Sequence, residues 1–322
     1  MRLRKYKTKY TLLSLSILAI IVLGIYSTTG FASTTYQTTF VKGTEIFTVN
    51  QYDDTAWKTV VDSNSTPVDW FEGDTNTTGA KSKITLKGWN YITWETWDVF
   101  TSIFMSSYFS FEDLFILLGI MDAIGYNETT VNANYTNSYN LWYGLRAVWN
   151  FTTNEFGELA SYNDGVFTFQ DPLDFKLILD DYNILAADLN GEMVIQLAGY
   201  SFPILNADEF LWQLALGGLA IATPQSGYLT NLITELGALN TTSNGAIFTF
   251  NRYGETNYSV VISYGEKGTL SSFTVKDNDG VVIFQIISTS SEWIFYLVLV
   301  ILAVCGSGLV VFIIIKKRKP KR

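Results

Sequence analysis

Apolar residues recur along this chain with two different periods, and the period changes from one segment to the next. Alternation of apolar and polar residues is typical of strands, because successive side chains point to opposite faces. Alternation or a short apolar run covers 44–52, 81–88, 90–99, 139–151, 165–170, 175–179 and 193–197. These segments predict strands, with hairpin turns at 163–165 and 190–191, where Asn, Asp and Gly occur together.

Residues 246–287 predict four further strands joined by short turns. They cover 246–253, 258–264, 269–275 and 281–287. The connecting sequences YGETN, GEKG and KDNDG supply the Gly, Asn and Asp residues that tight turns need. We expect a four-stranded antiparallel meander here.

Three segments follow the helical period. The first, 110–124, is apolar on nearly every side, so we expect a helix buried in the core. A helix on a membrane surface is the alternative, although it would lack the basic face of such helices. Asn206 begins the second helix, in which Gly217 and Gly218 indicate close backbone contact. The third helix covers 228–239, and 127–140 predicts a loop.

Together these patterns predict an α+β fold. We expect one or more curved antiparallel β-sheets, with a few short apolar helices packed on the concave face. If the domain consists of two halves, the polar loop near Asn134 is the best boundary. A C-terminal transmembrane helix completes the predicted architecture.

Both ends of the chain carry membrane signals. Residues 1–32 combine a basic head, an apolar run and small residues at Gly30 and Ala32. This pattern favours a cleaved signal peptide over an uncleaved signal anchor, and both put the same segment outside. Residues 293–315 form an uncharged apolar run that can span a bilayer, and 316–322 form a basic cytoplasmic tail. Residues 33–292 are therefore the predicted extracellular ectodomain.

Charge is segregated between the ends and the middle. The head holds five and the tail six of the 21 basic residues, so ten face the 30 acidic residues of the ectodomain, a formal charge of −20 (10 − 30). This charge disfavours nucleic acid as a partner. The chain has no histidine, which excludes Ser-His-Asp catalysis and His-ligated zinc. The single cysteine, Cys305, lies in the predicted span, so the ectodomain has no disulfide.

This layout resembles that of uncharacterised archaeal membrane-anchored cell-surface proteins. They share a signal segment, an ectodomain rich in Asn, Thr and Tyr, one C-terminal span and a basic tail. The resemblance covers the whole chain at the level of layout, without a diagnostic motif. It implies a plasma-membrane location with an extracellular ectodomain, and it assigns no functional residue.

Seven Asn-X-Ser/Thr sequons fall in the predicted ectodomain, which predicts a glycoprotein. The asparagines are Asn64, Asn76, Asn127, Asn134, Asn150, Asn240 and Asn257. Five lie in polar, loop-like sequence, where an attached sugar fits. Asn150 and Asn257 border strand-like runs and are less suited to glycosylation.

Carboxylates supply the other candidate chemistry. Asp277 and Asp279 resemble half of a calcium loop, but the remaining ligands of that motif are missing, so a hairpin turn is favoured over a metal site. Paired carboxylates could serve a glycosidase, although capping or solvated roles explain them better. The pairs are Asp53 with Asp54, Glu112 with Asp113, Asp171 with Asp174, Asp180 with Asp181, and Asp208 with Glu209.

Three hypotheses on function follow. The first is a non-enzymatic surface protein that is structural, adhesive or ligand-presenting, with no cofactor. The second is a binding module that encloses a lipid or another hydrophobic ligand, which would explain the apolar helices and the 16% of aromatic residues. The third is a carboxylate-dependent carbohydrate-active enzyme. Partners would be the membrane, a surface protein, a glycan or a hydrophobic ligand, and a homodimer through Ala303, Gly306 and Ser307 in the span is a minor hypothesis.

Overall fold

The structure is a computed structural model that describes residues 36–105, 109, 111–157 and 161–289. The chain divides into two units after Tyr36, and the features below belong to the unit that begins at Gln37. The predicted signal segment (1–32), the span (293–315), the basic tail (316–322) and the small residues Ala303, Gly306 and Ser307 lie outside the described residues.

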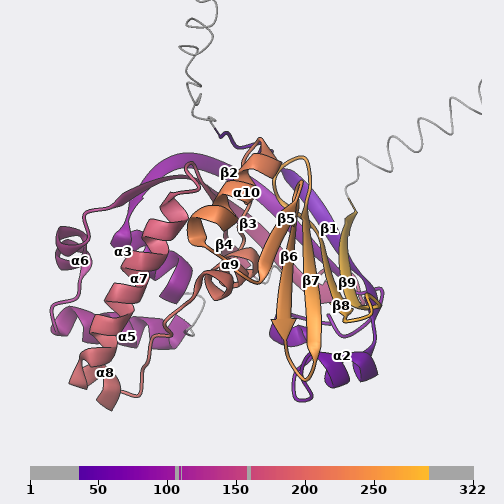
Figure 1. The fold of residues 1–322 in the computed structure, drawn as a ribbon, viewed down its shortest axis with the longest axis horizontal. Coiled ribbons are helices and arrows are strands. Elements are labelled where there is room, and N and C mark those ends of the chain that lie inside the picture. Colours follow the sequence, from indigo (N-terminus) through magenta and orange to yellow (C-terminus); the bar gives the residue numbers. More distant parts are fainter. Residues whose placement is uncertain (1–35, 106–108, 110, 158–160, 290–322) are drawn as a thin grey trace, which may run out of the picture. The chain divides into compact units, whose positions relative to one another are not determined.

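The described part is an α+β fold built on one curled sheet of nine antiparallel strands, a half-barrel, with eight α-helices (Figure 1). The strands are β1 (Gly43–Tyr52), β2 (Lys81–Glu95), β3 (Ser138–Thr152), β4 (Ser161–Phe169), β5 (Thr241–Asn244), β6 (Ile247–Tyr253), β7 (Asn257–Tyr264), β8 (Leu270–Asp277) and β9 (Val282–Thr289). Their order is β4-β3-β2-β1-β9-β8-β7-β6-β5.

Helices occur between the strands along the chain, but the strands still form one continuous hydrogen-bonded sheet. They are α2 (Asp54–Val60), α3 (Thr96–Val99), α5 (Phe111–Ala123), α6 (Glu128–Asn134), α7 (Asp174–Gly191), α8 (Met193–Leu197), α9 (Ala207–Leu216) and α10 (Gln225–Leu236). A 3₁₀ turn at Pro67–Asp69 and a π-helical turn at Phe100–Met105 complete the elements.

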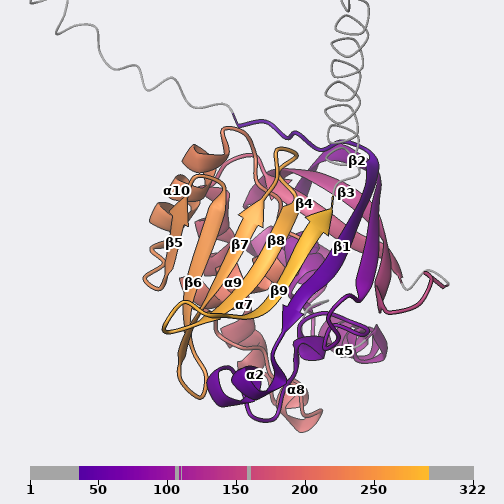
Figure 2. The ribbon, with the colours of Figure 1, turned by 90° about the vertical axis from the view of Figure 1, so that its right-hand side faces the viewer.

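The first and last strands of the sequence, β1 and β9, lie next to each other in the middle of the sheet. Ile46 of β1 lies opposite Thr289 of β9, and the Thr289 hydroxyl donates to the Ile46 carbonyl at 3.0 Å. Figure 2 shows β1 beside β9, with α7 and α9 behind the sheet. Register shifts occur in five strand pairs: β1–β9, β2–β3, β3–β4, β7–β8 and β8–β9. Such bulges increase local twist, which accounts for the curl.

Aromatic side chains fill the inside of the curl. The Trp212 ring of α9 lies 5.5 Å from Phe250 of β6 and 6.1 Å from Phe273 of β8, centroid to centroid. Phe71 contacts Phe273 at 4.9 Å and Phe151 of β3 at 6.5 Å. Since β3 and β8 are separated by three strands in the sheet, their contact with one ring shows that the sheet bends around it.

A second apolar cluster holds the helices together. Helix α7 buries Phe175, Ile178, Leu179, Tyr182, Leu185, Ala186 and Leu189. Tyr182 stacks on Phe104 of the π-helical turn with 3.9 Å between centroids, and Phe104 also contacts Phe210 of α9 at 5.6 Å. Helix α9 thus contributes to both clusters and connects the helical layer to the sheet.

The open edges of the sheet are covered or short. Beside β4, the Phe167 carbonyl accepts a hydrogen bond from Ala220 at 2.8 Å, and the Thr168 hydroxyl donates to the Ala220 carbonyl. Tyr228 of α10 donates to the Phe169 carbonyl at 2.8 Å. At the opposite edge, β5 has four residues.

Several local predictions were wrong. Segments 175–179 and 193–197 are helical, and the expected turn at 190–191 is the end of α7. The expected turn at 163–165 lies within β4. The apolar positions of α7 recur at the helical spacing over 18 residues, a pattern that a five-residue window cannot distinguish from a strand.

Two further corrections concern helices. The predicted loop 127–140 contains α6, which Asn127 caps by accepting from the Thr130 amide at 3.1 Å. The helix at 110–124 exists as α5, but of its described side chains only Leu117 and Met121 are buried. A segment that is apolar all round does not reveal how much of it the fold will cover.

Prediction: Gly268→Ala will destabilise the protein more than Gly280→Ala. Both glycines have positive φ, 73° and 81°, which costs an L-residue roughly 1–2 kcal/mol. A Cβ at Gly268 would lie 2.1 Å from the Ile221 carbonyl oxygen, whereas none of the described atoms lies within 4 Å of one at Gly280. Denaturant unfolding should show an additional loss of about 1–3 kcal/mol for the first variant. Equal losses would contradict the close approach.

Candidate functional site

The curled sheet encloses a cavity of about 290 Å³, here called the half-barrel cavity. Its walls come from the inner faces of β1, β2 and β3, from β4, β8 and β9, and from two crossing segments, 70–72 and 215–219. Along β3, Arg146, Val148 and Asn150 line it at alternate positions, and Phe151 follows them near the end of the strand. The alternation of the strand therefore presents one set of side chains to the interior.

Apolar side chains line much of this cavity. They include Phe47, Phe71, Ile84, Leu86, Val148, Val166, Leu219, Phe273 and Ile286. Several of these residues, such as Phe47 and Phe273, are buried, so their positions are fixed by packing. A cavity with fixed apolar walls and a few polar groups is the common form of a small-molecule site.

Four charged residues also line the half-barrel cavity: Glu45, Glu72, Arg146 and Lys267. Glu72 accepts a hydrogen bond from the Asn150 amide at 2.7 Å, which fixes both side chains. Gly218 leaves room for Arg146, because a Cβ there would lie 2.9 Å from a guanidinium nitrogen and 2.4 Å from the Gly165 carbonyl oxygen. The close backbone contact predicted at Gly217 and Gly218 is thus confirmed at Gly218, although the pair ends α9 instead of lying inside it.

A second hollow, here called the α9 groove, has a volume of about 700 Å³. It lies between the start of α9, the residues that lead into β5, and the adjacent ends of β6, β7 and β8. Its walls are mainly polar, with asparagine, aspartate, serine and threonine side chains. The half-barrel cavity and the α9 groove share none of their lining residues.

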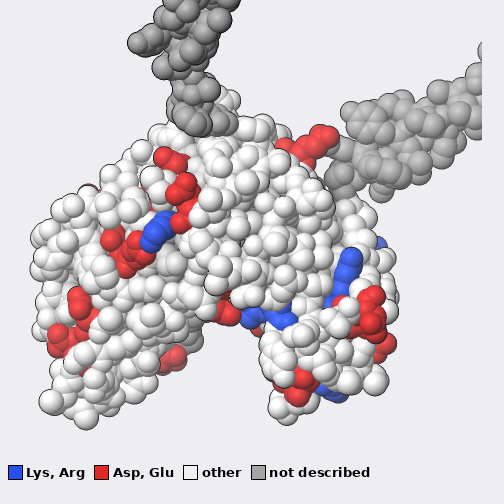
Figure 3. All heavy atoms as spheres, in the orientation of Figure 1, with Lys and Arg blue, Asp and Glu red and all other residues white. Residues whose placement is uncertain are grey.

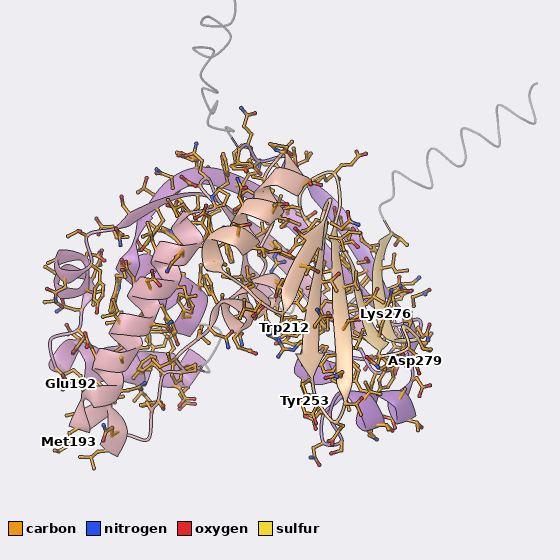
Figure 4. All side chains as sticks on the ribbon, viewed as in Figure 1. Glu192, Met193, Trp212, Tyr253, Lys276 and Asp279 are labelled. Atoms are coloured by element: carbon orange, nitrogen blue, oxygen red, sulfur yellow. The ribbon has the colours of Figure 1, made fainter. Side chains whose placement is uncertain are left out.

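An exposed apolar surface, here called the α5–α8 patch, is the third feature. It consists of Phe115 and Ile116 on α5 and Met193, Val194 and Leu197 on α8, two helices that pack together. Leu197 is 81% exposed and Met193 71%. Figure 4 shows Met193 at the outer end of α8, next to Glu192. Such exposure of large apolar side chains on two neighbouring helices is unusual.

The sequons occupy different settings in the structure. Asn64 and Asn76 lie in exposed turns, and Asn134 is the exposed last residue of α6. Asn127 caps α6 and also donates to Asp122 at 3.0 Å. Asn240 and Asn257 are exposed and line the α9 groove, whereas Asn150 points its amide at Glu72 inside the half-barrel cavity. Glycosylation of all seven remains a prediction.

The candidate calcium residues lie in the turn between β8 and β9. The Asp277 carboxylate accepts from the amides of Asp279 and Val281 at 3.0 and 2.8 Å, which closes the turn. Within the described ranges, no group of three Asp, Glu, Cys or His residues is arranged to hold a metal ion.

Most of the paired carboxylates make structural hydrogen bonds. Asp181 accepts from the Thr96, Asn137 and Tyr139 side chains at 3.1, 2.9 and 2.7 Å. Asp53 caps α2 by accepting from Ala56 at 2.9 Å, and Asp54 pairs with Lys58 at 2.9 Å.

Asp174 is the carboxyl whose environment is least favourable for charge. Burial raises its pKa to about 7, and the neighbouring Asp171 carboxylate adds to the rise. A raised pKa suits a general acid. However, Asp174 lines neither the half-barrel cavity nor the α9 groove.

Within the described part of the chain, no single helix has the length and apolar character needed to cross a bilayer. Taken together, α5 and α6 meet those criteria, but they are bent by 67° relative to each other.

No protein-family model matches the chain, and no characterised protein and no solved structure matches it. The structural class of the described part is therefore defined by its geometry alone, as an α+β domain with a cavity inside a curled antiparallel sheet.

Sequence reasoning did not identify the residues that line the cavity and the groove. One signal was present, because Arg146 is the one charged residue in the apolar stretch LWYGLRAVW of β3. The groove carried no such signal, since its walls come from segments that are up to 72 positions apart, from Asn206 to Asn278.

Prediction: Asp174→Asn will remove a pH-dependent loss of stability. The pKa of an aspartate in the unfolded chain is about 3.9. Between about pH 4 and 7 the folded state therefore binds more protons than the unfolded state does. The free energy of unfolding should therefore fall as pH rises through that window, by roughly 1–3 kcal/mol, because partial exposure weakens the effect. Urea unfolding at pH 4.5 and 8 tests this. Asp171→Asn should reduce the loss without removing it, and an unchanged pH profile in Asp174→Asn would refute the assignment.

Proposed function

We propose that the chain is a membrane-anchored, non-enzymatic cell-surface protein whose ectodomain binds a small, mainly apolar ligand in the half-barrel cavity. The observation that carries this proposal is the cavity itself, about 290 Å³ inside the curled sheet. That volume is close to the lower end of the range typical of ligand sites, roughly 300–1,000 Å³. The ligand class is a lipid fragment or another hydrophobic molecule.

The character of the lining supports an amphipathic ligand. The apolar residues of β1–β4, β8 and β9 can cover a hydrophobic body. Glu45, Glu72, Arg146 and Lys267 bring charges of both signs to the same walls, so a polar group on the ligand would find partners.

Location and architecture enter the proposal from the sequence. A C-terminal transmembrane helix at 293–315 would anchor the ectodomain in the plasma membrane, with the helices on the concave face of the sheet forming the wall opposite the strands. The ectodomain charge of −20 (10 − 30), and the exposure of Asn64, Asn76 and Asn134, agree with an extracellular, glycosylated surface.

Prediction: Val148→Phe will fill the half-barrel cavity and weaken ligand binding. Val148 lines the cavity, so a larger ring should displace an apolar probe by roughly tenfold or more in Kd, equal to about 1.4 kcal/mol. Fluorescence titration of the purified protein with N-phenyl-1-naphthylamine measures this.

Leu145→Phe is the matched control. Leu145 lies on the same strand, faces the opposite side and is 47% exposed, so its variant should bind as the wild type does. Extraction of the wild-type protein followed by mass spectrometry should also recover a bound apolar molecule, at a lower level from Val148→Phe. Equal probe binding by both variants would contradict the proposal.

An adhesive role is the second candidate, and the α5–α8 patch favours it. No lysine or arginine occurs in 88–145 or 177–251, which include both helices of the patch. The visible surface around α5 and α8 is accordingly neutral or acidic (Figure 3). The complementary partner is a protein surface with an apolar centre and a rim of Lys and Arg.

Prediction: a helical Leu/Lys peptide will bind the α5–α8 patch, and a Leu/Glu peptide of the same length will not. Met193→Ser with Leu197→Ser should weaken binding by about tenfold, because two exposed apolar contacts are lost. Val281→Ser, at an exposed valine in the β8–β9 turn, is the control and should leave the affinity unchanged. Isothermal titration calorimetry measures the affinity of the Leu/Lys peptide for the wild type, the double variant and the control variant, and that of the Leu/Glu peptide for the wild type. Binding of neutral phospholipid vesicles that the double variant abolishes would instead indicate a membrane-facing surface and refute a protein partner.

A further inference from the structure

The α9 groove has an architecture of its own that the proposed apolar site does not explain. Its lining is mainly polar, whereas apolar side chains line much of the half-barrel cavity. The groove therefore suits a different chemical class of ligand.

The floor of the groove is fixed by an aspartate. The Asp208 carboxylate accepts from the amides of Leu239 and Asn240, both at 3.0 Å, and from the Thr241 hydroxyl at 2.7 Å. These bonds join the first turn of α9 to the start of β5. Asn206 caps the same helix by accepting from Glu209 at 2.9 Å. The groove is thus held open by hydrogen bonds among its own wall residues.

The side wall is fixed by an arginine. The Arg252 guanidinium lies 4.2 Å from the centre of the Trp212 ring, and one nitrogen lies 3.8 Å from the Glu209 carboxylate. Its Nε also donates to the Tyr258 hydroxyl at 3.4 Å. Cation–π contact and ion pairing therefore hold a long side chain in one position.

Other polar side chains of the groove remain available to a ligand. The side-chain amides of Asn251, Asn257 and Asn278 make no hydrogen bond to any other part of the chain that the structure describes, and all three residues are exposed. Each amide offers donors and an acceptor close together. Tyr253 adds a ring that is 78% exposed, at the end of β6 (Figure 4).

This set of groups favours a neutral saccharide. Paired donors and acceptors match adjacent hydroxyl groups, and an exposed ring can lie against the apolar face of a sugar. Asp208, Glu209 and Asp277 outnumber Arg252, so the groove disfavours phosphate and other anions. The mainly polar wall also gives little gain for an apolar ligand.

We propose that the α9 groove is a saccharide-binding site. The saccharide can come from two sources. One is a free or neighbouring glycan of the cell surface. The other is the chain's own N-linked glycan, because the sequon residues Asn240 and Asn257 both line the groove and a sugar attached there would begin inside it.

The experiment uses the full chain in mild detergent, purified from a host without N-glycosylation and from one with it. Unglycosylated protein is titrated by saturation-transfer NMR with malto-, manno-, cello- and chito-oligosaccharides to millimolar concentration. An external saccharide is the source if one of them binds, Tyr253→Ala weakens it by about tenfold or more and Tyr253→Phe, which keeps the ring, changes it little.

The chain's own glycan is the source if glycosylation protects β6 and β7 amides from hydrogen exchange, and Thr242→Ala with Ser259→Ala removes that protection. These substitutions delete both sequons and keep both asparagines. The proposal is overturned if no saccharide binds the unglycosylated protein and glycosylation leaves groove protection unchanged, or if binding is insensitive to Tyr253→Ala. The half-barrel cavity is untouched by every variant here.

Discussion

The pairing of β1 with β9 is the contact on which the rest of the structure depends. It joins β1–β4, from the first half of the described residues, to the four-stranded meander β6–β9 of the second half, and it makes one sheet of nine strands. Without it, β1–β4 and β5–β9 would be two separate sheets, each with a new open edge, at β1 and at β9, and each with part of the aromatic core. Loop closure over more than 200 residues is entropically costly, so this pairing requires apolar contacts to offset it, such as those of the Phe71 ring with the buried rings of Phe273 and Phe284.

The curl of this sheet determines where the half-barrel cavity lies. Bulges in five strand pairs increase the twist, and the inner face then surrounds a volume that α9 and the segment 70–72 fill only partly. The remaining space is the half-barrel cavity. Helix α9 serves two surfaces, because Trp212 packs against Phe250 and Phe273 inside the curl and also supports Arg252 at the groove. The two proposed sites therefore share one rigid element while differing in polarity.

Much of the sheet could be predicted from the sequence, because alternation is a local property. Eight of its nine strands, β1 through β4 and β6 through β9, correspond in place or in part to alternating segments. Helix α7 was not predicted, since its helical pattern emerges only over 18 residues and short windows within it resemble strands. The exposure of α5 could not be predicted either, because the burial of a helix depends on which other elements pack against it. A helix that is apolar on all sides does not show which face will be buried.

The α9 groove shows a limit of a different kind, since its walls come from α9, β5, β6, β7 and a turn that only the fold brings together. The covered edges of the sheet have one more consequence. Beside β4, the segment 218–220 occupies backbone groups that another chain could otherwise pair with, and β5 offers a strand of four residues at the far side. Neighbouring copies at high local concentration would therefore lack a template for joining strand to strand, so crowding need not lead to fibres.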